Sequence, residues 1–161
     1  MLKFNNKINY IVILFLSILI LLSAYFIEYI LNYKACYLCI IERIPYIVAI
    51  FITSLMLLTK KYEKIALLFL SLNFLAGGIV SFYHFGIEQG FFSEAAVCNV
   101  SGDNVDLSKN SLLKELQSEQ ISCKDVDFTI MGMSLATINT IISFLLSIII
   151  FKLFINYEKN K

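Results

Sequence analysis

The sequence predicts an all-α membrane protein in which four helices cross the bilayer as a bundle, and two observations carry that prediction. Of its 161 residues, 59% are hydrophobic, whereas a soluble globular domain is roughly 45–50% apolar. The apolar residues also gather in long runs, and a helix of about 20 such residues crosses a hydrocarbon core of roughly 30 Å. We therefore expect a single membrane domain over residues 1–161.

The apolar runs predict four spans, over about residues 10–30, 40–59, 65–86 and 130–154. The second span is the shortest, and Pro45 favours a helix that begins close to Ile44. Lys60 and Lys61 can lengthen its other end, because long basic side chains reach from an apolar stretch to the lipid headgroups. The first run is too long for a signal peptide, so we expect it to remain in the mature protein.

Basic side chains predict which way the bundle faces. The side with both termini holds Lys3, Lys7, Lys60, Lys61, Lys64, Lys152, Lys159 and Lys161. The opposite side has fewer basic residues near the span ends, and it carries nearly all of the acids. By the positive-inside rule, we expect both termini in the cytoplasm and every cysteine outside, where disulfides persist.

Residues 87–129 form the one sizeable polar segment between the predicted spans. A turn signature over residues 101–104 precedes a helical pattern that places Leu112, Leu113 and Leu116 on one face. Such a helix either packs on top of the bundle or lies in the plane of the membrane interface.

Cys36 and Cys39 form a C-x-x-C pair at the edge of the second span, and this position favours redox chemistry. At this spacing the two sulfurs can meet on a helix or a tight turn, and a nearby cation favours the reactive thiolate. Arg43 lies four residues beyond Cys39. At the apolar edge it needs an anionic or strongly accepting partner, such as a thiolate, a quinone oxygen or Glu42. The alternative is that Arg43 reaches outward to lipid headgroups.

Cys98 and Cys123, which enclose residues 99–122, are the other two cysteines. Such a pair outside the cell is ordinarily a structural disulfide. Close to a second redox-active pair, exchange with an external thiolate is the favoured interpretation. Four cysteines could also bind zinc, but a C-x-x-C zinc site normally has a second closely spaced motif. We therefore expect no metal.

His84 is the only histidine, and it lies near the outer end of the third span. Glu88 is four residues further on and could orient the imidazole or stabilise its charge. The ring could donate to a quinone carbonyl or shuttle a proton. Equally, it could be an interfacial residue bonded to the backbone or to a tyrosine.

Three segments together resemble the DsbB family of bacterial disulfide bond formation proteins. The stretch from Cys36 to Tyr46 is similar to the family signature C-x-L-C-x-x-Q/E-R-x-P-Y. The other two matching stretches are Tyr83 to Gly90, ahead of Cys98, and Phe128 to Asn139, after Cys123. With the four-span layout, the resemblance covers nearly the whole chain. Ile41 stands where many relatives have an aromatic residue, and the chain has no Trp, so the residues that pack a quinone ring stay open.

The resemblance implies a protein-thiol:quinone oxidoreductase of the bacterial inner membrane. Such an enzyme reoxidises DsbA, a periplasmic thioredoxin-fold oxidase, and passes the electrons through ubiquinone or menaquinone to the respiratory chain. By this match, the partner attacks the Cys98–Cys123 disulfide and Cys98 forms the mixed disulfide. Cys123 then exchanges with Cys36, and Cys39 faces the quinone. Arg43 would stabilise the Cys39 thiolate and hold the quinone oxygen, with His84 beside it.

Two other functions compete with this one. A vitamin K epoxide reductase-like enzyme also combines four helices with C-x-x-C, but there the motif comes late in the catalytic core. A non-catalytic scaffold would use its cysteines only as structural disulfides. Thiol trapping in membranes with and without quinone separates the second alternative from an enzyme.

Overall fold

The computed structural model describes residues 6–59, 62–93, 123–124, 129–130 and 132–159. Within that part of the chain, four helical stretches are long and apolar enough to cross a membrane: Lys7–Tyr29, Tyr37–Thr59, Glu63–Glu88 and Leu135–Tyr157. The predicted all-α four-span bundle is therefore confirmed. The helix expected around Leu112 and the residue Cys98 lie outside the described residues.

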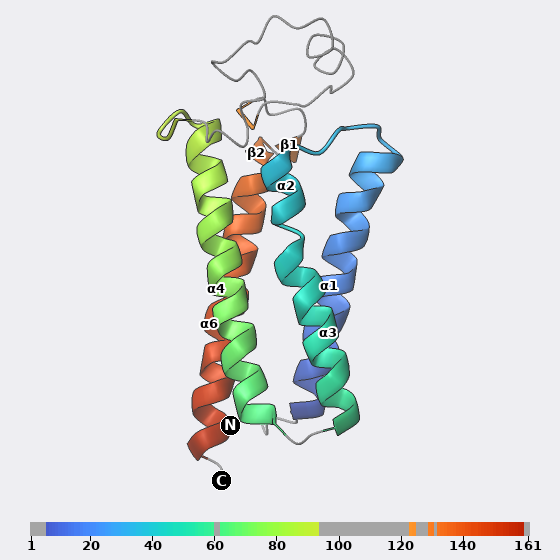
Figure 1. Cartoon of the computed structure of the whole chain (residues 1–161), viewed down its shortest axis with the longest axis vertical. Coiled ribbons are helices and arrows are strands. Elements are labelled where there is room, and N and C mark those ends of the chain that lie inside the picture. The colour runs from blue at the N-terminus through green and yellow to red at the C-terminus, as the bar shows by residue number, and fades with distance from the viewer. Residues whose placement is uncertain (1–5, 60–61, 94–122, 125–128, 131, 160–161) are drawn as a thin grey trace, which may run out of the picture.

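The bundle consists of two pairs of helices that run side by side (Figure 1). Helix α1 (Asn6–Tyr29) packs along α3 (Ile44–Thr59), and α4 (Glu63–Glu88) packs along α6 (Leu135–Lys159). Contacts between α3 and α4 join the two pairs. The beginning of α1 and the end of α6 lie at the same end of the bundle (Figure 1).

Small residues allow close approach between the helices. Ser71 of α4 and Ser147 of α6 each donate a side-chain hydrogen bond to the other's backbone carbonyl, at 3.2 and 3.0 Å. Gly77 of α4 lies against the ring of Pro45. Lipid tails are as apolar as leucine, so helices in a bilayer associate through this kind of close packing and interhelical hydrogen bonding. Many large apolar side chains remain exposed on the outer surface, as a lipid-facing surface requires.

The second span is interrupted near its outer end. A short helix α2 (Tyr37–Ile41) ends at Glu42, and α3 begins at Ile44, one residue before Pro45. Proline lacks the N–H that would continue the helix from the residue four positions earlier. The predicted start of a helix near Ile44 is confirmed, but the spanning stretch itself begins at Tyr37 rather than at residue 40.

The fourth span begins at Leu135, about five residues later than the sequence pattern indicates. The residues before it form a two-stranded antiparallel hairpin of β1 (Thr129–Ile130) and β2 (Met133–Ser134), with Thr129 opposite Ser134. Gly132 turns this hairpin with φ at +80°, a conformation that glycine adopts without steric cost. Apolar composition alone cannot separate this strand from the helix that follows it.

Candidate dithiol redox site

The backbone places Cys36 at the start of α2. After α1 the chain turns at Asn32, whose φ is +56°, a region that asparagine tolerates better than most residues. Cys36 then adopts an extended conformation as the N-cap residue, and its Sγ accepts a hydrogen bond from the backbone N–H of Cys39 at 3.2 Å. Both cysteines are free thiols.

His84 joins Cys36 from the neighbouring helix α4. Its Nε2 is 3.5 Å from the Cys36 sulfur, and its Nδ1 is 2.7 Å from Oε1 of Glu42. The side chains of His84 and Glu42 are both buried. Glu88, the carboxylate expected beside His84, has its Oε1 3.8 Å from Nε2 and accepts a hydrogen bond from Ser134. Glu88 is thus within ion-pair distance, but Glu42 is the closer partner.

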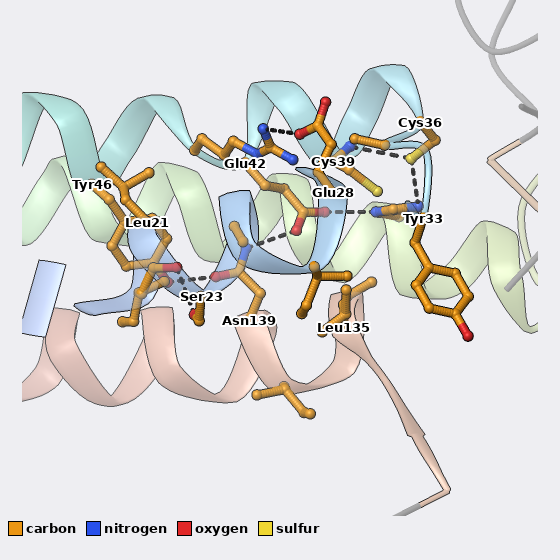
Figure 2. A pocket seen from close by; sticks show the side chains of 18 of the residues that line it. Leu21, Ser23, Glu28, Tyr33, Cys36, Cys39, Glu42, Tyr46, Leu135 and Asn139 are labelled. Carbon is orange, nitrogen blue, oxygen red and sulfur yellow. Dashed lines mark hydrogen bonds and ion pairs between the residues drawn. The ribbon is translucent and has the colours of Figure 1, made fainter. Parts of the chain in front are cut away.

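A second set of hydrogen bonds fixes Glu42. The side-chain amide of Asn139, on α6, donates to Oε2 of Glu42 at 2.7 Å and to Oγ of Ser81 at 2.7 Å. The hydroxyl of Tyr46 donates to the carbonyl oxygen of the same amide, and it also lies 3.3 Å from Oγ of Ser143. Glu42, Tyr46 and Asn139 lie together in Figure 2. Side chains from three helices thereby hold the carboxylate in place.

The environment of Cys36 favours its thiolate. Hydrogen bonding from Cys39 is the largest cause, followed by the hydrogen bond and charge of His84; together they lower the pKa of Cys36 from 9.0 to about 5, although burial opposes the shift. Cysteines with such depressed pKa values are typical of thiol–disulfide enzymes.

Arg43 points to a different partner. Its Nη1 is 2.5 Å from Oε2 of Glu28, on α1, and its guanidinium group lies 4.8 Å from the ring centre of Tyr25. Its side chain is only 13% exposed, so Arg43 lies inside the bundle rather than reaching out to headgroups. Glu42, one of the partners expected from the sequence, is bound to His84 instead.

Cys123 lies close to the dithiol pair. It is disulfide-bonded and almost fully buried. It belongs to the same buried cluster as Cys36, Leu38 and Ile87, and Cys39 packs against that cluster. One end of the bundle therefore holds a disulfide sulfur and two free thiols.

A pocket of about 250 Å³ opens beside the dithiol pair, between α1 and the other helices (Figure 2). Its polar lining includes Cys39, Arg43 and Glu28. Its apolar walls come from α1 and α6 and include Ile20, Leu21, Ile27, Leu135, Ile138 and Ile142. A mostly apolar cavity with a few convergent polar groups is the usual form of a small-molecule site.

Most of the site residues expected from the sequence meet in this pocket. Cys36, Cys39, Arg43 and His84 all line it, and Cys123 lies in the adjoining cluster. Sequence reasoning missed Glu28 and gave no role to Asn139. Glu28 carried a detectable signal, because an acid inside an apolar span normally faces a partner or a cavity.

Four helices long enough to span a membrane, a pair of free thiols at one end and a separate disulfide define a membrane-embedded thiol–disulfide oxidoreductase. The family model for "Disulfide bond formation protein DsbB" matches residues 6–153 of the chain. The chain belongs to this family, whose activity is disulfide-bond formation in the membrane. The match decides in favour of DsbB over the vitamin K epoxide reductase-like alternative.

One similar protein is the "Uncharacterized protein RP370" of Rickettsia prowazekii (strain Madrid E). It is 29% identical over 161 residues, which cover 99% of this chain and 94% of the relative. No solved structure matches the chain significantly.

Proposed function

We propose that this protein oxidises a periplasmic thioredoxin-fold thiol protein similar to DsbA and passes the electrons to membrane quinone. One observation carries the proposal above the others: a disulfide-bonded Cys123 and the free thiol of Cys36 share one buried cluster, and Cys39 connects that cluster to an apolar pocket.

Thiol–disulfide exchange accounts for the route of the electrons. The partner's thiolate attacks the Cys98–Cys123 disulfide at Cys98, forming a mixed disulfide and releasing the Cys123 thiolate. When the inner pair is oxidised, Cys123 attacks Cys36, and Cys39 leaves as a thiolate. The partner's second thiolate attacks the mixed disulfide, which forms the partner's own disulfide and releases Cys98 as a thiolate. Cys98 then attacks Cys123, and Cys36 leaves as a thiolate. In sum, the partner gains a disulfide and the Cys36–Cys39 pair is reduced by two electrons.

The pocket suits a quinone. Arg43 supplies a charged donor for a carbonyl oxygen, Cys39 is the sulfur that lines the same space, and the apolar walls match a lipophilic ring. A bound ubiquinone or menaquinone would accept two electrons and two protons. Glu28 holds the Arg43 guanidinium beside the pocket. Both ring nitrogens of His84 already face groups of the protein itself, so its contribution is to the thiols rather than to a quinone carbonyl.

The orientation follows from the same proposal. The dithiol end of the bundle faces the periplasm, and both termini lie on the cytoplasmic side of the bacterial inner membrane. The lysine asymmetry supports this, and so does the need of disulfides for an oxidising compartment.

Thiol trapping tests the redox function. Membranes with and without respiratory quinone are treated with a maleimide reagent, and the labelling of Cys36 and Cys39 is compared. We expect the pair to be mainly oxidised with quinone and to accumulate as thiols without it. Labelling that does not depend on quinone would support the non-catalytic scaffold instead.

A further inference from the structure

A thiol, an imidazole and a carboxylate are aligned at the outer end of the bundle. The sulfur of Cys36 faces Nε2 of His84 at 3.5 Å, and Nδ1 of the same ring faces Oε1 of Glu42 at 2.7 Å. Glu42 accepts the Nδ1 proton, which leaves the lone pair of Nε2 directed at the sulfur. This is the order of groups in which a cysteine nucleophile is activated by a base that a third residue orients.

We propose that Cys36, His84 and Glu42 form a catalytic triad, in which His84 takes and returns the proton of the Cys36 thiol while Glu42 positions the ring. The inference rests on the proposed function, because Cys36 is there the sulfur that exchanges with Cys123. In the forward step the S–H bond breaks and an N–H bond forms at Nε2, with no electrons transferred. When Cys36 leaves an exchange as a thiolate, the charged ring stabilises it and returns the proton.

The contacts of Glu42 support a positioning role. Asn139 binds the carboxylate oxygen that does not face His84, and Ser81 binds the same amide. Arg43, its neighbour in sequence, is engaged by Glu28. The carboxylate of Glu42 is therefore directed to the imidazole rather than to Arg43.

Other ionisable groups surround this triad. Glu88 also approaches His84, from the same helix. The remaining titratable residues that line the pocket are Glu28, Tyr33, Lys34, Cys39, Arg43 and Tyr46, and α6 contributes the uncharged Asn139. Glu88 is the rival carboxylate, so Glu88→Gln is the matched control for Glu42→Gln.

Nitrogen-15 NMR of the histidine ring tests the proposal directly, because His84 is the chain's only histidine. Purified, quinone-free, dithiol protein with a histidine-free tag is labelled and measured at pH 7. If Nε2 has taken the proton of the Cys36 thiol, the ring should be charged, with both nitrogens protonated. When Cys36→Ala removes the thiol, we expect a larger neutral fraction of the ring, with its proton at Nδ1. A neutral ring in the dithiol protein, or a charge unaffected by Cys36→Ala, would overturn the triad.

The pH dependence of Cys36 alkylation is the second test. It is measured with iodoacetamide in a Cys39→Ser background, where the hydroxyl retains a donor and Cys36 is the remaining free thiol. We expect the midpoint to rise by at least one pH unit with His84→Gln, a tenfold or greater loss of thiolate below the midpoint. Glu42→Gln should raise it more than Glu88→Gln does.

An unchanged midpoint in His84→Gln would refute the role of the imidazole. Equal shifts from the two glutamate variants would refute the assignment of Glu42. Both measurements omit quinone and the soluble partner, so their outcomes are independent of whether the electron route proposed above is correct. The NMR test uses the native ring, so it remains decisive if His84→Gln fails to fold.

Discussion

Arg43 is ion-paired with Glu28 across the boundary between the α2–α3 junction and α1, with 2.5 Å between Nη1 and Oε2. Tyr25, one turn from Glu28, stacks against the guanidinium group. Glu28 and Arg43 both line the pocket beside the dithiol pair. Through this ion pair, helix α1 fixes the position of the Arg43 guanidinium, the group proposed to bind quinone.

Replacing Arg43 should impair the use of quinone. Losing a hydrogen bond to a charged group costs about 1.5–3 kcal/mol, so Arg43→Ala should raise the quinone KM roughly 10- to 150-fold. Arg43→Lys should restore it only in part, because lysine lacks the planar fork that binds two acceptors. Steady-state quinone reduction measures this, with the exchange at Cys98–Cys123 expected to stay intact. An unchanged KM and turnover would remove Arg43 from the site.

The stability of the same variants separates structure from catalysis. Arg43→Ala leaves Glu28 as an uncompensated charge inside the bundle, which is strongly destabilising. The double variant Arg43→Ala/Glu28→Gln should recover most of the thermal stability in detergent and none of the quinone affinity. Recovery of both properties would show that Arg43 acts only by neutralising Glu28.

The side-chain amide of Asn139 should contribute more to the stability of the protein than the Tyr46 hydroxyl that donates to it. Asn139→Ala leaves a buried oxygen of Glu42 without its donor, which costs about 1–3 kcal/mol. Tyr46→Phe removes the hydrogen bond to the other end of the amide and leaves that donor in place. Thermal unfolding should therefore show the larger loss for Asn139→Ala, and equal losses would argue against Glu42 as the centre of the network.

Two adjacent glycines give a matched test of helix packing. A Cβ added at Gly77 would lie 2.8 Å from Cγ of Pro45, whereas at Gly78 the nearest atoms are those of the Phe144 ring at 3.4 Å. The proline ring is rigid, so Gly77→Ala should destabilise the protein by about 1–3 kcal/mol. Gly78→Ala should have a small effect. A similar melting temperature for both variants would contradict this close contact between α3 and α4.

Capture of the soluble partner tests the order of exchange. Cys123→Ser leaves Cys98 without its intramolecular competitor, so a mixed disulfide should accumulate with a thioredoxin-fold protein whose second cysteine has been replaced. Non-reducing gels and mass spectrometry identify the joined cysteines. Accumulation only in a Cys98→Ser background would reverse the assignment and make Cys123 the attacked sulfur.

Reporter fusions test the orientation in the membrane. A fusion at Tyr62 should report the cytoplasm and one at Asn104 the periplasm, because the lysine-rich end is expected inside. Two reporters are fused at each position, one that is active only outside the cytoplasm and one that is active only inside it. The first should be active at Asn104 and the second at Tyr62. Agreement between the two positions would contradict the proposed topology.

The sequence by itself determined the four spans, the start of a helix near Ile44 and the position of the dithiol pair at one end of the bundle. These features depend on local quantities: the length of an apolar run, the missing N–H of Pro45, and the three-residue spacing of Cys36 and Cys39. The hairpin before Leu135 escaped this reasoning, because Ile130 and Met133 extend the apolar run of the helix that follows them.

Only the tertiary structure decided which charged groups meet. Glu42 and Arg43 are neighbours in the chain, yet one binds His84 on α4 and the other binds Glu28 on α1. Helical spacing favoured Glu88 for His84, because that pair is four residues apart. The closer carboxylate comes from 42 residues away, since the interruption before Pro45 and the packing of α2 against α4 bring it there. Charges inside an apolar bundle pair with whatever group the helix packing presents, and that packing depends on all four helices together.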